Sequence, residues 1–489
     1  MDRRHCANPG RSNCSTSRTW AHQHGFLYRR FLQSDYFPQH AVDLRNFHFG
    51  DTAVFRLETA KGVCGVLNRS SGGLLNESTK KRVLIRRILK GIVALVFLGL
   101  FGVSALLMSL WLAHRSEIAL PKPTGQVAVG RTLYDWVDDQ TLDSLAPAGT
   151  KHELLVWVWY PAAAPSSEKI AEYVPDATRE AVEHDRGPLL RLLTKDLSKV
   201  HTHSLRDADV SQQQRSYPVV ITRAGASLEV WNYSTLAEDL ASHGYVVVGI
   251  DAPYRTFVVA FPDGRVIRRL PENNPELCIG RVGEEQPRCV NRVLTAWTSD
   301  IGCVLDRLGQ LNKSDPSGKF TGRLDMTRVG VFGHSFGGAQ AAQFCSEDSR
   351  CKAGIDVDGS LHGSVVQSGI PTPFMFLGSG EGDFSSSAEV RQVEADIKSV
   401  YDRLPPNGRL RLSIRGANHF TFSDDGALLR SHAFRWVLRR IGKLGIDGPR
   451  QLAVTSYCIR SFFDRYLKQT TSSEPTISSS LYPEIQVVE

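Results

Sequence analysis

The pattern of apolar and polar positions divides the chain into four stretches. Residues 1–79 are polar and rich in Arg and Ser, without the period of 2 of a strand or 3.6 of a helix, so we expect a disordered segment. An uncharged apolar run occupies 91–113. From 120 to 468, short apolar runs alternate with amphipathic stretches, and the Ser/Thr-rich residues 469–489 are predicted to form a disordered tail.

The apolar run at 91–113, GIVALVFLGLFGVSALLMSLWLA, predicts a membrane-spanning helix. A helix rises about 1.5 Å per residue, so roughly 20 apolar residues cross a hydrocarbon layer about 30 Å thick. Lys and Arg residues cluster just before the run, which predicts that this side stays cytoplasmic and that the rest is exported to the periplasmic or extracellular side. We therefore expect 80–115 to be a basic flank and a signal-anchor. The alternative is a cleaved signal, whose apolar core is usually shorter, about 7–15 residues.

The runs that follow predict an α/β domain at 120–468. Runs rich in β-branched and aromatic residues indicate strands, and their alternation with helical stretches is typical of a mostly parallel sheet with helices on both faces. Two stretches, 162–216 and 252–290, interrupt this alternation and are predicted to be insertions. The expected strands lie at 127–137, 153–160, 217–222, 245–250, 329–332, 353–357, 373–377 and 410–414, and the expected helices at 178–194, 233–243, 293–311, 335–344, 388–404 and 450–467.

Composition and charge narrow the classes of function. The net charge is +7, but much of the basic excess lies before residue 115, so we expect no nucleic-acid surface. Nine cysteines do not make a disulfide scaffold in a chain of this length. In an oxidising space, Cys278 is placed to pair with Cys289, and Cys345 with Cys351. Because the sequence has no Cys-x-x-Cys pair, a zinc site has no support. No motif indicates a cofactor, and we expect none. Nothing in the composition indicates an oligomeric state.

The clearest chemical motif is Gly-His-Ser-Phe-Gly at 333–337. A Gly-x-Ser-x-Gly run alone is weak evidence, but here a short apolar strand precedes it and small residues open a helix after it. Such a sharp turn lifts the serine hydroxyl clear of the backbone at a helix N-terminus, where the dipole favours negative charge. We therefore expect Ser335 to be a nucleophile, with His334 packed beneath the turn.

A nucleophilic serine needs a base and an acid that orients the base. His419 is the strongest candidate base because it follows the last predicted parallel strand, as expected for the order Ser…Asp…His. Asp358 follows the strand after the nucleophile and Asp383 follows the next one, and spacing alone leaves the choice between them open. The oxyanion hole is expected from the amides of Phe336, after the nucleophile, and Ala226, after the first buried parallel strand.

Several short runs of the chain carry a family resemblance: GHSFGGA at 333–339, SED at 346–348, GIDVD at 354–358, DLASHGY at 239–245, VGR at 129–131 and VWYP at 158–161. Together they resemble the platelet-activating-factor acetylhydrolases of the plasma and intracellular type II kind, over roughly 124–468, and VGR and VWYP resemble bacterial members of that family. The resemblance implies an α/β-hydrolase fold, Asp358 rather than Asp383 as the acid, no metal, and hydrolysis of short or oxidised acyl chains from phospholipid-like esters. The chain departs from the family at Ala224-Gly225, where His-Gly is common, and this leaves the shape of the oxyanion loop open.

Together these features predict a serine ester hydrolase that cleaves short acyl chains from phospholipid-like or related esters through an acyl-enzyme, held in a membrane by 91–113. A general carboxylesterase, polyester hydrolase or lactone hydrolase with the same machinery is the alternative, because the acyl pocket falls in the variable stretches 162–216 and 252–290. A third hypothesis is an inactive membrane-tethered binding protein that keeps the fold.

Overall fold

The computed structural model describes most of the chain after residue 72. The chain divides into two units, Met1–Arg87 and Ile88–Glu489, and helix α2 (Gly73–Arg115) begins in the first and ends in the second. The disorder expected for 1–79 falls almost wholly outside the described residues. These residues are 73–163, 169–281, 283–380, 388–429, 435–436, 439–440, 445–469, 477 and 480–488.

Helix α2 contains the predicted apolar run, and its large apolar side chains are exposed. Leu95 is 69% exposed and Phe101 is 73% exposed. Within the described part of the chain, α2 is the one helix whose length and composition suit a membrane span, over Thr79–Arg115. A signal sequence has the same properties, so composition alone does not separate the two.

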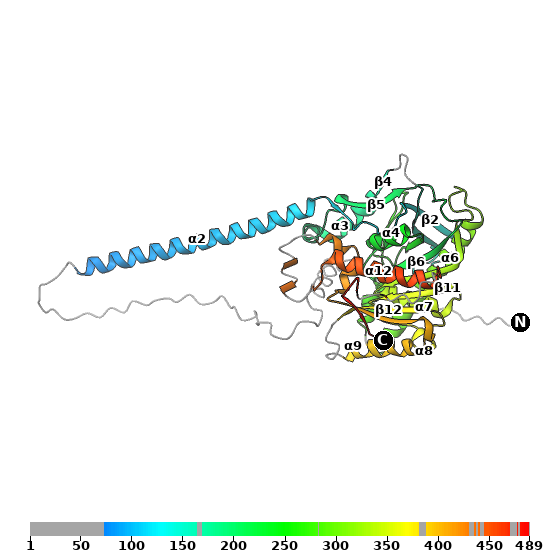
Figure 1. Ribbon diagram of the computed structural model, residues 1–489. Helices are drawn as coiled ribbons and strands as arrows, with labels where there is room; N and C mark the ends of the chain where they lie inside the picture. Colours follow the sequence, from blue (N-terminus) through cyan, green and yellow to red (C-terminus); the bar gives the residue numbers. More distant parts are fainter. Residues whose placement is uncertain are drawn as a thin grey trace, which may run out of the picture. The chain divides into compact units, whose positions relative to one another are not determined.

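The rest of the second unit is built on one sheet of twelve strands (Figure 1). Six successive strands of the sheet are parallel to one another: β7 (Val246–Asp251), β6 (Tyr217–Arg223), β10 (Leu324–His334), β11 (Cys351–Val357), β12 (Phe374–Gly380) and β13 (Arg409–Arg415). Strand β3 (Lys151–Pro161) runs antiparallel to β2 (Val129–Leu142) and to β7, and β14 (Ile485–Val487) runs antiparallel to β13. A separate hairpin, β8 (Val258–Ala260) and β9 (Val266–Arg268), follows β7. In spatial order the sheet contains β1 (Ile118–Ala119), β5 (Val200–Arg206), β2 (Val129–Leu142), β3 (Lys151–Pro161), β7 (Val246–Asp251), β6 (Tyr217–Arg223), β10 (Leu324–His334), β11 (Cys351–Val357), β12 (Phe374–Gly380), β13 (Arg409–Arg415) and β14 (Ile485–Val487), with β4 (Ile170–Glu172) beside β5.

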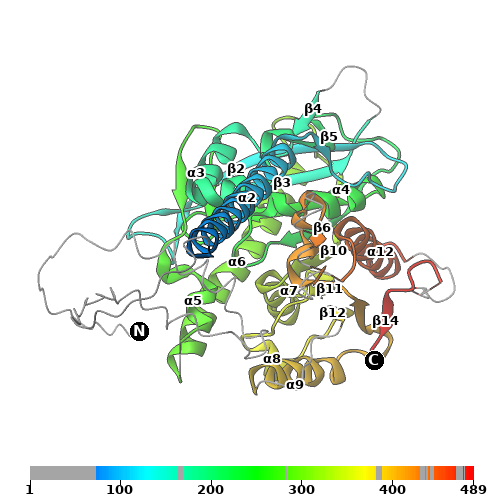
Figure 2. The same ribbon diagram turned by 90° about the vertical axis from the view of Figure 1, so that its left-hand side faces the viewer.

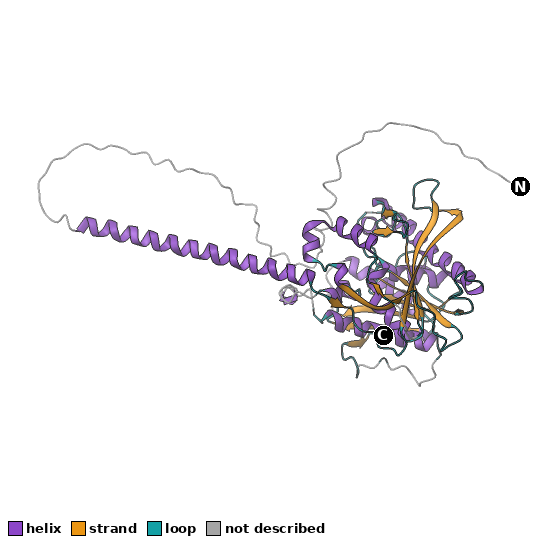
Figure 3. Ribbon diagram, turned by 90° about the horizontal axis from the view of Figure 1, so that it is seen from above, coloured by secondary structure: helices purple, strands orange, loops and turns teal. Residues whose placement is uncertain are grey.

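Helices pack on both faces of the sheet, as Figure 3 shows. Every residue of β6 is buried, and Val219 and Ile221 belong to one apolar cluster whereas Val220 belongs to the other. Successive side chains of a strand point to opposite faces, so a strand covered on both faces is a continuous apolar run. The first face carries α4 (Ser234–Ser242) and α12 (Gly448–Tyr466), and the second carries α6 (Glu285–Lys313), α7 (Phe336–Glu347), α8 (Val365–Ser368) and α9 (Ala388–Asp402). The remaining helices are α3 (Asp176–Leu193), α5 (Pro275–Ile279), α10 (Asp425–Leu428) and the short 3-10 turns η2 (Leu197–Lys199), η3 (Val230–Tyr233), η4 (Pro271–Asn273), η5 (Pro406–Gly408) and η6 (His419–Phe422).

The stretch 162–216 is more than an insertion, because its strands β4 and β5 join the sheet. The sequence pattern did not indicate β5 because its inward side chains include Thr202 and Ser204, which are polar. Thr202 donates a hydrogen bond to the carbonyl of Ala171, and Ser204 donates one to Glu238. Buried polar groups with partners carry little penalty, so a polar segment can serve as a covered strand.

The prediction of a disordered tail is wrong at its end. Strand β14 pairs antiparallel with β13, and Ile485 is 4% exposed. Glu484, the residue before β14, forms an ion pair with Arg450 of α12 at 2.8 Å. These partners lie far apart along the chain, so local composition did not reveal the pairing.

Both pairs of neighbouring cysteines named from the sequence form disulfides. Cys278–Cys289 joins α5 to α6, and Cys345–Cys351 joins α7 to β11. The paired cysteines are 11 and 6 residues apart in the sequence, so each disulfide closes a short loop. Disulfides of this kind persist in oxidising compartments.

Candidate active site

The chain turns from β10 into α7 at Ser335. This residue has φ 57° and ψ −125°, in the left-handed region that side chains other than glycine rarely adopt. Such a conformation costs about 1–3 kcal/mol and persists where the surrounding structure enforces it. Here the amide of Ser335 donates to the carbonyl of Val357, and the amide of Gly338 donates to the carbonyl of Ser335, both at 2.9 Å. The strand, tight turn and helix expected around this serine are therefore present.

The two glycines of the motif are required by the tightness of the turn. A Cβ atom on Gly333 would overlap the carbonyl group of Gly337, and a Cβ atom on Gly337 would overlap the carbonyl oxygen of Arg223. Both neighbours are backbone and cannot rotate aside as a side chain can. The spacing Gly-x-Ser-x-Gly is therefore a packing requirement that places Ser335 against the end of β6.

Asp358 and His419 are joined by a hydrogen bond. Nδ1 of His419 donates to Oδ2 of Asp358 at 2.8 Å. Asp358 directly follows β11 and also accepts from the amide of Ser379 at 2.6 Å and from its hydroxyl at 2.9 Å. Burial raises the pKa of the Asp358 carboxyl, but the hydrogen bond and charge of His419 outweigh it, so that pKa lies below its ordinary value. The His419 side chain is 38% exposed and thus remains accessible from outside.

His419 lies against the nucleophile turn. Its ring centroid is 4.6 Å from that of His334, the residue directly before Ser335. From the other side, a Cβ atom on Gly359, next to Asp358, would lie 2.5 Å from the carbonyl oxygen of Ser335. The ends of β10, β11 and β13 thus bring the predicted serine, aspartate and histidine to one place.

His334 packs beneath the turn, as expected. Burial, followed by the neighbouring His419, lowers the pKa of His334 to about 3, so it is neutral near pH 7. Its Nδ1 accepts a hydrogen bond of 2.8 Å from the hydroxyl of Tyr233. His334 is therefore a neutral support for the turn, chemically distinct from the partly exposed His419.

The loop after β6 passes beside the nucleophile. A Cβ atom on Gly225 would lie 3.3 Å from Cβ of Ser335. The carbonyl of Gly225 accepts from the amide of Leu228, and because a peptide is planar and trans, the N–H of Ala226 points the opposite way. Among the described residues, this N–H has no hydrogen-bond partner. The loop can therefore offer the Ala226 amide, as the oxyanion hypothesis requires.

Two residues that the sequence analysis did not name hold this loop. The hydroxyl of Tyr233 accepts from the amide of Gly225 at 3.2 Å. The guanidinium of Arg269 donates to the carbonyl of Ala226. Tyr233 lies in a helix start and Arg269 in a stretch predicted to be an insertion, so neither belongs to a recognisable motif.

A buried group of charged side chains ties the end of β6 to α7. Arg255 pairs with Asp143 at 2.7 Å and with Asp300 at 2.6 Å, and all three are almost fully buried. Arg223, the last residue of β6, donates from Nε to Gln340 of α7 at 2.5 Å and lies 3.8 Å from Asp300. Breaking one member would leave a buried charge unpaired, which typically costs about 3–5 kcal/mol. These partners are distant in sequence, so no local signal indicated them.

Two other aspartates lie near the site in sequence, Asp356 and Asp383. Asp356 points into the interior, where it is 2% exposed and accepts from the amide of Gly359 at 2.9 Å. Burial raises the pKa of Asp356 to about 8, which suits a neutral structural group. Asp383, the alternative acid, lies outside the described residues.

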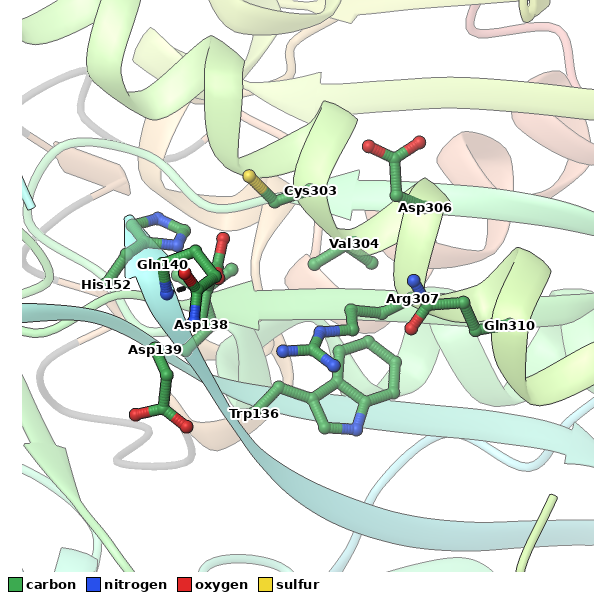
Figure 4. A pocket seen from close by; sticks show the side chains of 11 residues that line it. Trp136, Asp138, Asp139, Gln140, His152, Cys303, Val304, Asp306, Arg307 and Gln310 are labelled. Carbon is green, nitrogen blue, oxygen red and sulfur yellow. Dashed lines mark hydrogen bonds between the residues drawn. The ribbon is translucent and has the colours of Figure 1, made fainter. Parts of the chain in front are cut away.

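A hollow of about 400 Å³ opens between β2, β3 and α6 (Figure 4). Its lining contains none of the residues predicted for the site. An acyl pocket needs mostly apolar walls, whereas charged and amide side chains dominate here, so we do not assign the active site to it. It is lined by Trp136, Asp138, Asp139, Gln140, His152, Leu154, Cys303, Val304, Asp306, Arg307 and Gln310. In the described part of the chain, no three His, Cys, Asp or Glu side chains are grouped so that they could hold a metal ion.

Comparison with known proteins places this site in a family. The family model for platelet-activating factor acetylhydrolase, isoform II, matches residues 112–468. The chain belongs to this family. The match runs from the end of α2 to just past the end of α12 and leaves out only β14 of the sheet, and it bears out the resemblance noted in the sequence.

Individual relatives of the acetylhydrolase family share about a quarter of their residues with this chain. A probable 1-alkyl-2-acetylglycerophosphocholine esterase of Arthroderma benhamiae is 27% identical over 282 residues, which are 55% of this chain and 65% of the relative. The platelet-activating factor acetylhydrolase of Cavia porcellus is 26% identical over 222 residues, 42% of this chain and 48% of the relative. The chain thus spans 48% to 65% of the length of these curated relatives.

A solved structure agrees with the fold. The ferulic acid esterase from Streptomyces cinnamoneus aligns with a TM-score of 0.59 and 27% identity, over 76% of this chain and 100% of that one. The mostly parallel α/β sheet predicted from the alternating strands and helices, and the α/β-hydrolase fold that the family resemblance implied, are therefore confirmed.

Proposed function

We propose that this chain is a serine ester hydrolase in which Ser335 attacks the ester carbonyl, His419 accepts the serine proton, and Asp358 orients His419. The observation that carries the proposal is the 2.8 Å hydrogen bond from Nδ1 of His419 to Asp358 beside the strained serine. This bond selects the tautomer in which Nε2 can accept a proton. The lowered pKa of Asp358 keeps its carboxylate ionised, which stabilises the imidazolium that forms.

The reaction proceeds through an acyl-enzyme. Attack by Ser335 gives a tetrahedral oxyanion, which the amides of Phe336 and Ala226 stabilise together with the N-terminus of α7. His419 then passes the proton to the leaving alcohol, and the same base activates the water that releases the acid. The loss of one oxyanion donor typically costs about 2.7–4 kcal/mol of transition-state stabilisation.

We propose short acyl esters of phospholipid-like alcohols as the substrate class. The activities for which the relatives from Arthroderma benhamiae and Cavia porcellus are named support this choice. A broader carboxylesterase or polyester hydrolase is the second candidate. It is supported by the ferulic acid esterase structure and by cutinase 1 of Thermobifida cellulosilytica, which is 21% identical over 268 residues.

We propose further that α2 anchors the enzyme with its α/β domain on the exported side. The basic residues at 80–90 favour a cytoplasmic position for the start of α2. The two disulfides favour an oxidising compartment for the domain. A reporter fused after Arg115 is expected to be active only in its exported form, and a reporter active in the cytoplasm would contradict this topology.

Hydrolysis of p-nitrophenyl acetate and butyrate by the detergent-solubilised chain tests the enzyme proposal. Ser335→Ala is expected to abolish turnover, and Asp358→Asn to lower kcat by about 10⁴-fold because the base loses its orientation. Ser346→Ala, at the far end of the same helix, is the matched control: it removes a hydroxyl that donates to the carbonyl of Gly369 at 2.7 Å, and turnover should stay unchanged.

The outcomes separate the hypotheses. A Ser335→Ala variant as active as the wild type would refute the enzyme proposal in favour of a binding protein. A small effect of Asp358→Asn would transfer the role of the acid to Asp383. A panel of esters that differ in acyl length and alcohol then distinguishes the two substrate classes.

A further inference from the structure

The C-terminal end of α2 is bonded into the α/β domain. The ammonium of Lys195 donates to the carbonyl of Ala113 at 2.8 Å and to the hydroxyl of Ser116 at 2.7 Å. The amide of Asp196 donates to the carbonyl of His114 at 3.1 Å. The last carbonyls of a helix lack partners within it, and a cation there also meets the negative end of the dipole. Lys195 is 6% exposed, so this joint is buried.

The connection from α2 to the sheet is very short. Helix α2 ends at Arg115, and β1 begins at Ile118. Ile118 is 4% exposed and pairs with Val200 of β5, and the amide of Leu120 donates to the carbonyl of His201 at 2.9 Å. A flexible linker lets a domain turn freely, whereas a connection bonded at both ends does not. The bonds at both ends of this connection therefore restrict how the C-terminal end of α2 can turn against the domain.

The residues that hold α2 directly follow α3, which borders the edge of the active site. Asp185 of α3 forms an ion pair of 2.7 Å with Arg268, in the hairpin that follows the carboxyl end of β7. Tyr173, just before α3, donates from its hydroxyl to Asp424 at 3.0 Å, in the segment that follows His419. Figure 2 shows the end of α2 beside α3. The same side of the domain thus carries the helix and the rim of the site.

Exposed apolar side chains flank the mouth of the site. Phe420, directly after the proposed base, is 56% exposed, and Leu277 and Ile279 on α5 are 44% and 42% exposed. Helix α5 is tied to the oxyanion loop because Glu276 accepts from the hydroxyl of Ser227 at 2.6 Å. Exposed apolar groups at the mouth of a site are typical of a surface that meets another apolar phase. A bilayer crossed by α2 would bring such a phase to this side of the domain.

We propose that α2 is a rigid bracket that holds the mouth of the active site against the surface of the membrane it spans. The enzyme then takes ester lipids directly from that leaflet, and their acyl chains reach Ser335 without crossing water. The partner of this surface is a lipid bilayer, which the apolar side chains of Phe420, Leu277 and Ile279 enter at the level of the headgroups. The inference rests on the proposed esterase function and names the source of its substrate.

The test uses the full chain in phosphatidylcholine vesicles that contain a phosphatidylcholine with one short acyl chain. Two water-soluble substrates, p-nitrophenyl acetate and monomeric dibutyryl phosphatidylcholine, report hydrolysis without the membrane. In the released variant, Lys195→Ala is combined with about ten Gly/Ser residues inserted between Ser116 and Glu117, so that a flexible linker joins α2 to the domain. Lys151→Ala is the matched control, because its ammonium also donates to a backbone carbonyl, that of Asp139.

We expect the released variant to hydrolyse both soluble substrates at the wild-type rate and the vesicle ester about tenfold more slowly. The reason is that a flexible tether samples many orientations of the mouth. The control should match the wild type on all three substrates. Equal rates on the vesicle ester would overturn the bracket and leave the esterase proposal intact. A wild type inactive on every substrate would instead overturn the proposed function.

Hydrogen exchange of the wild-type chain gives a second test that does not depend on a variant. We compare the chain in vesicles with the chain held by a narrow belt of amphipathic polymer around α2. Amides of Pro275–Ile279 and His419–Phe422 are expected to exchange more slowly in vesicles, because lipid covers them. Amides of 314–323, which lead into the amino end of β10, should exchange alike in both. Equal exchange at all three segments would contradict the proposal.

Discussion

Tyr233 joins the oxyanion loop to the nucleophile turn through a single buried hydroxyl. Its oxygen accepts from the amide of Gly225 at 3.2 Å and donates to Nδ1 of His334 at 2.8 Å, and the residue is 1% exposed. The substitution Tyr233→Phe removes only this oxygen and leaves the packing of the ring nearly unchanged. It therefore isolates the contribution of the two hydrogen bonds.

The expected magnitude follows from the groups left behind. A buried donor or acceptor without a partner costs about 1–3 kcal/mol, and both the Gly225 amide and Nδ1 of His334 lose theirs, so the free energy of unfolding should fall by about 2–6 kcal/mol. Removing a whole oxyanion donor lowers kcat by about 10²–10³-fold. Because Tyr233→Phe only loosens the loop that presents Ala226, we expect kcat to fall by about 10–100-fold with KM little changed.

Urea unfolding and steady-state hydrolysis of p-nitrophenyl acetate measure the two effects. The matched control is Tyr466→Phe, which removes one hydroxyl that donates to the carbonyl of Asn407 at 2.7 Å on the surface of α12. It should change stability by about 0.5 kcal/mol or less and leave kcat unchanged. If the two variants behave alike, or if Tyr233→Phe raises KM and leaves kcat intact, the reasoning about the loop is refuted.

Further predictions concern buried charge and the disulfides. Burial raises the pKa of Asp356 to about 8 from an unfolded value near 3.9, so the contribution of its protonated form to stability is complete below about pH 4 and is lost as the pH rises toward 8. The stability of the Asp356→Asn variant relative to the wild type should therefore be higher at about pH 8 than at about pH 5. If urea unfolding gives the same difference in stability between the two proteins at both pH values, the prediction is contradicted. The stabilisation by a disulfide grows with the length of the loop that it closes, here 11 residues for Cys278–Cys289 and 6 for Cys345–Cys351. Replacing the first pair by Ser should therefore lower the free energy of unfolding by about 3 kcal/mol, and replacing the second pair by about 2 kcal/mol. A wild type whose unfolding is insensitive to reductant would argue against both bridges.

Local sequence was sufficient wherever neighbouring residues impose the structure. The continuous apolar run of β6 is a strand because helices cover both of its faces, and this pattern is visible in the sequence. The turn at Ser335 was predictable because Gly333 and Gly337 each meet backbone that excludes any side chain. His419 was predictable from its place after the last parallel strand, since the carboxyl ends of such strands meet at one edge.

The fold also contains elements that no local pattern indicates. Strand β5 is polar, and its hydrogen bonds to Ala171 and Glu238 are made across long sequence separations. Strand β14 becomes a strand only because β13 presents a free edge to it. The choice of Asp358 over Asp383 rested on family resemblance, because a strand end alone does not specify which carboxylate meets the histidine.

By itself, the sequence was enough to predict the α/β fold, the apolar helix, the tight turn at Ser335 and a histidine after the last parallel strand, because periodicity, side-chain size and strand order are properties of neighbouring residues. Only the tertiary structure decided what supports them. It showed that Tyr233 and Arg269 hold the loop of Ala226, and that Lys195 bonds the end of α2 into the domain. Such contacts depend on which surfaces meet after the chain has folded, and a hydrogen bond between residues far apart in sequence leaves no trace in the local pattern at either one.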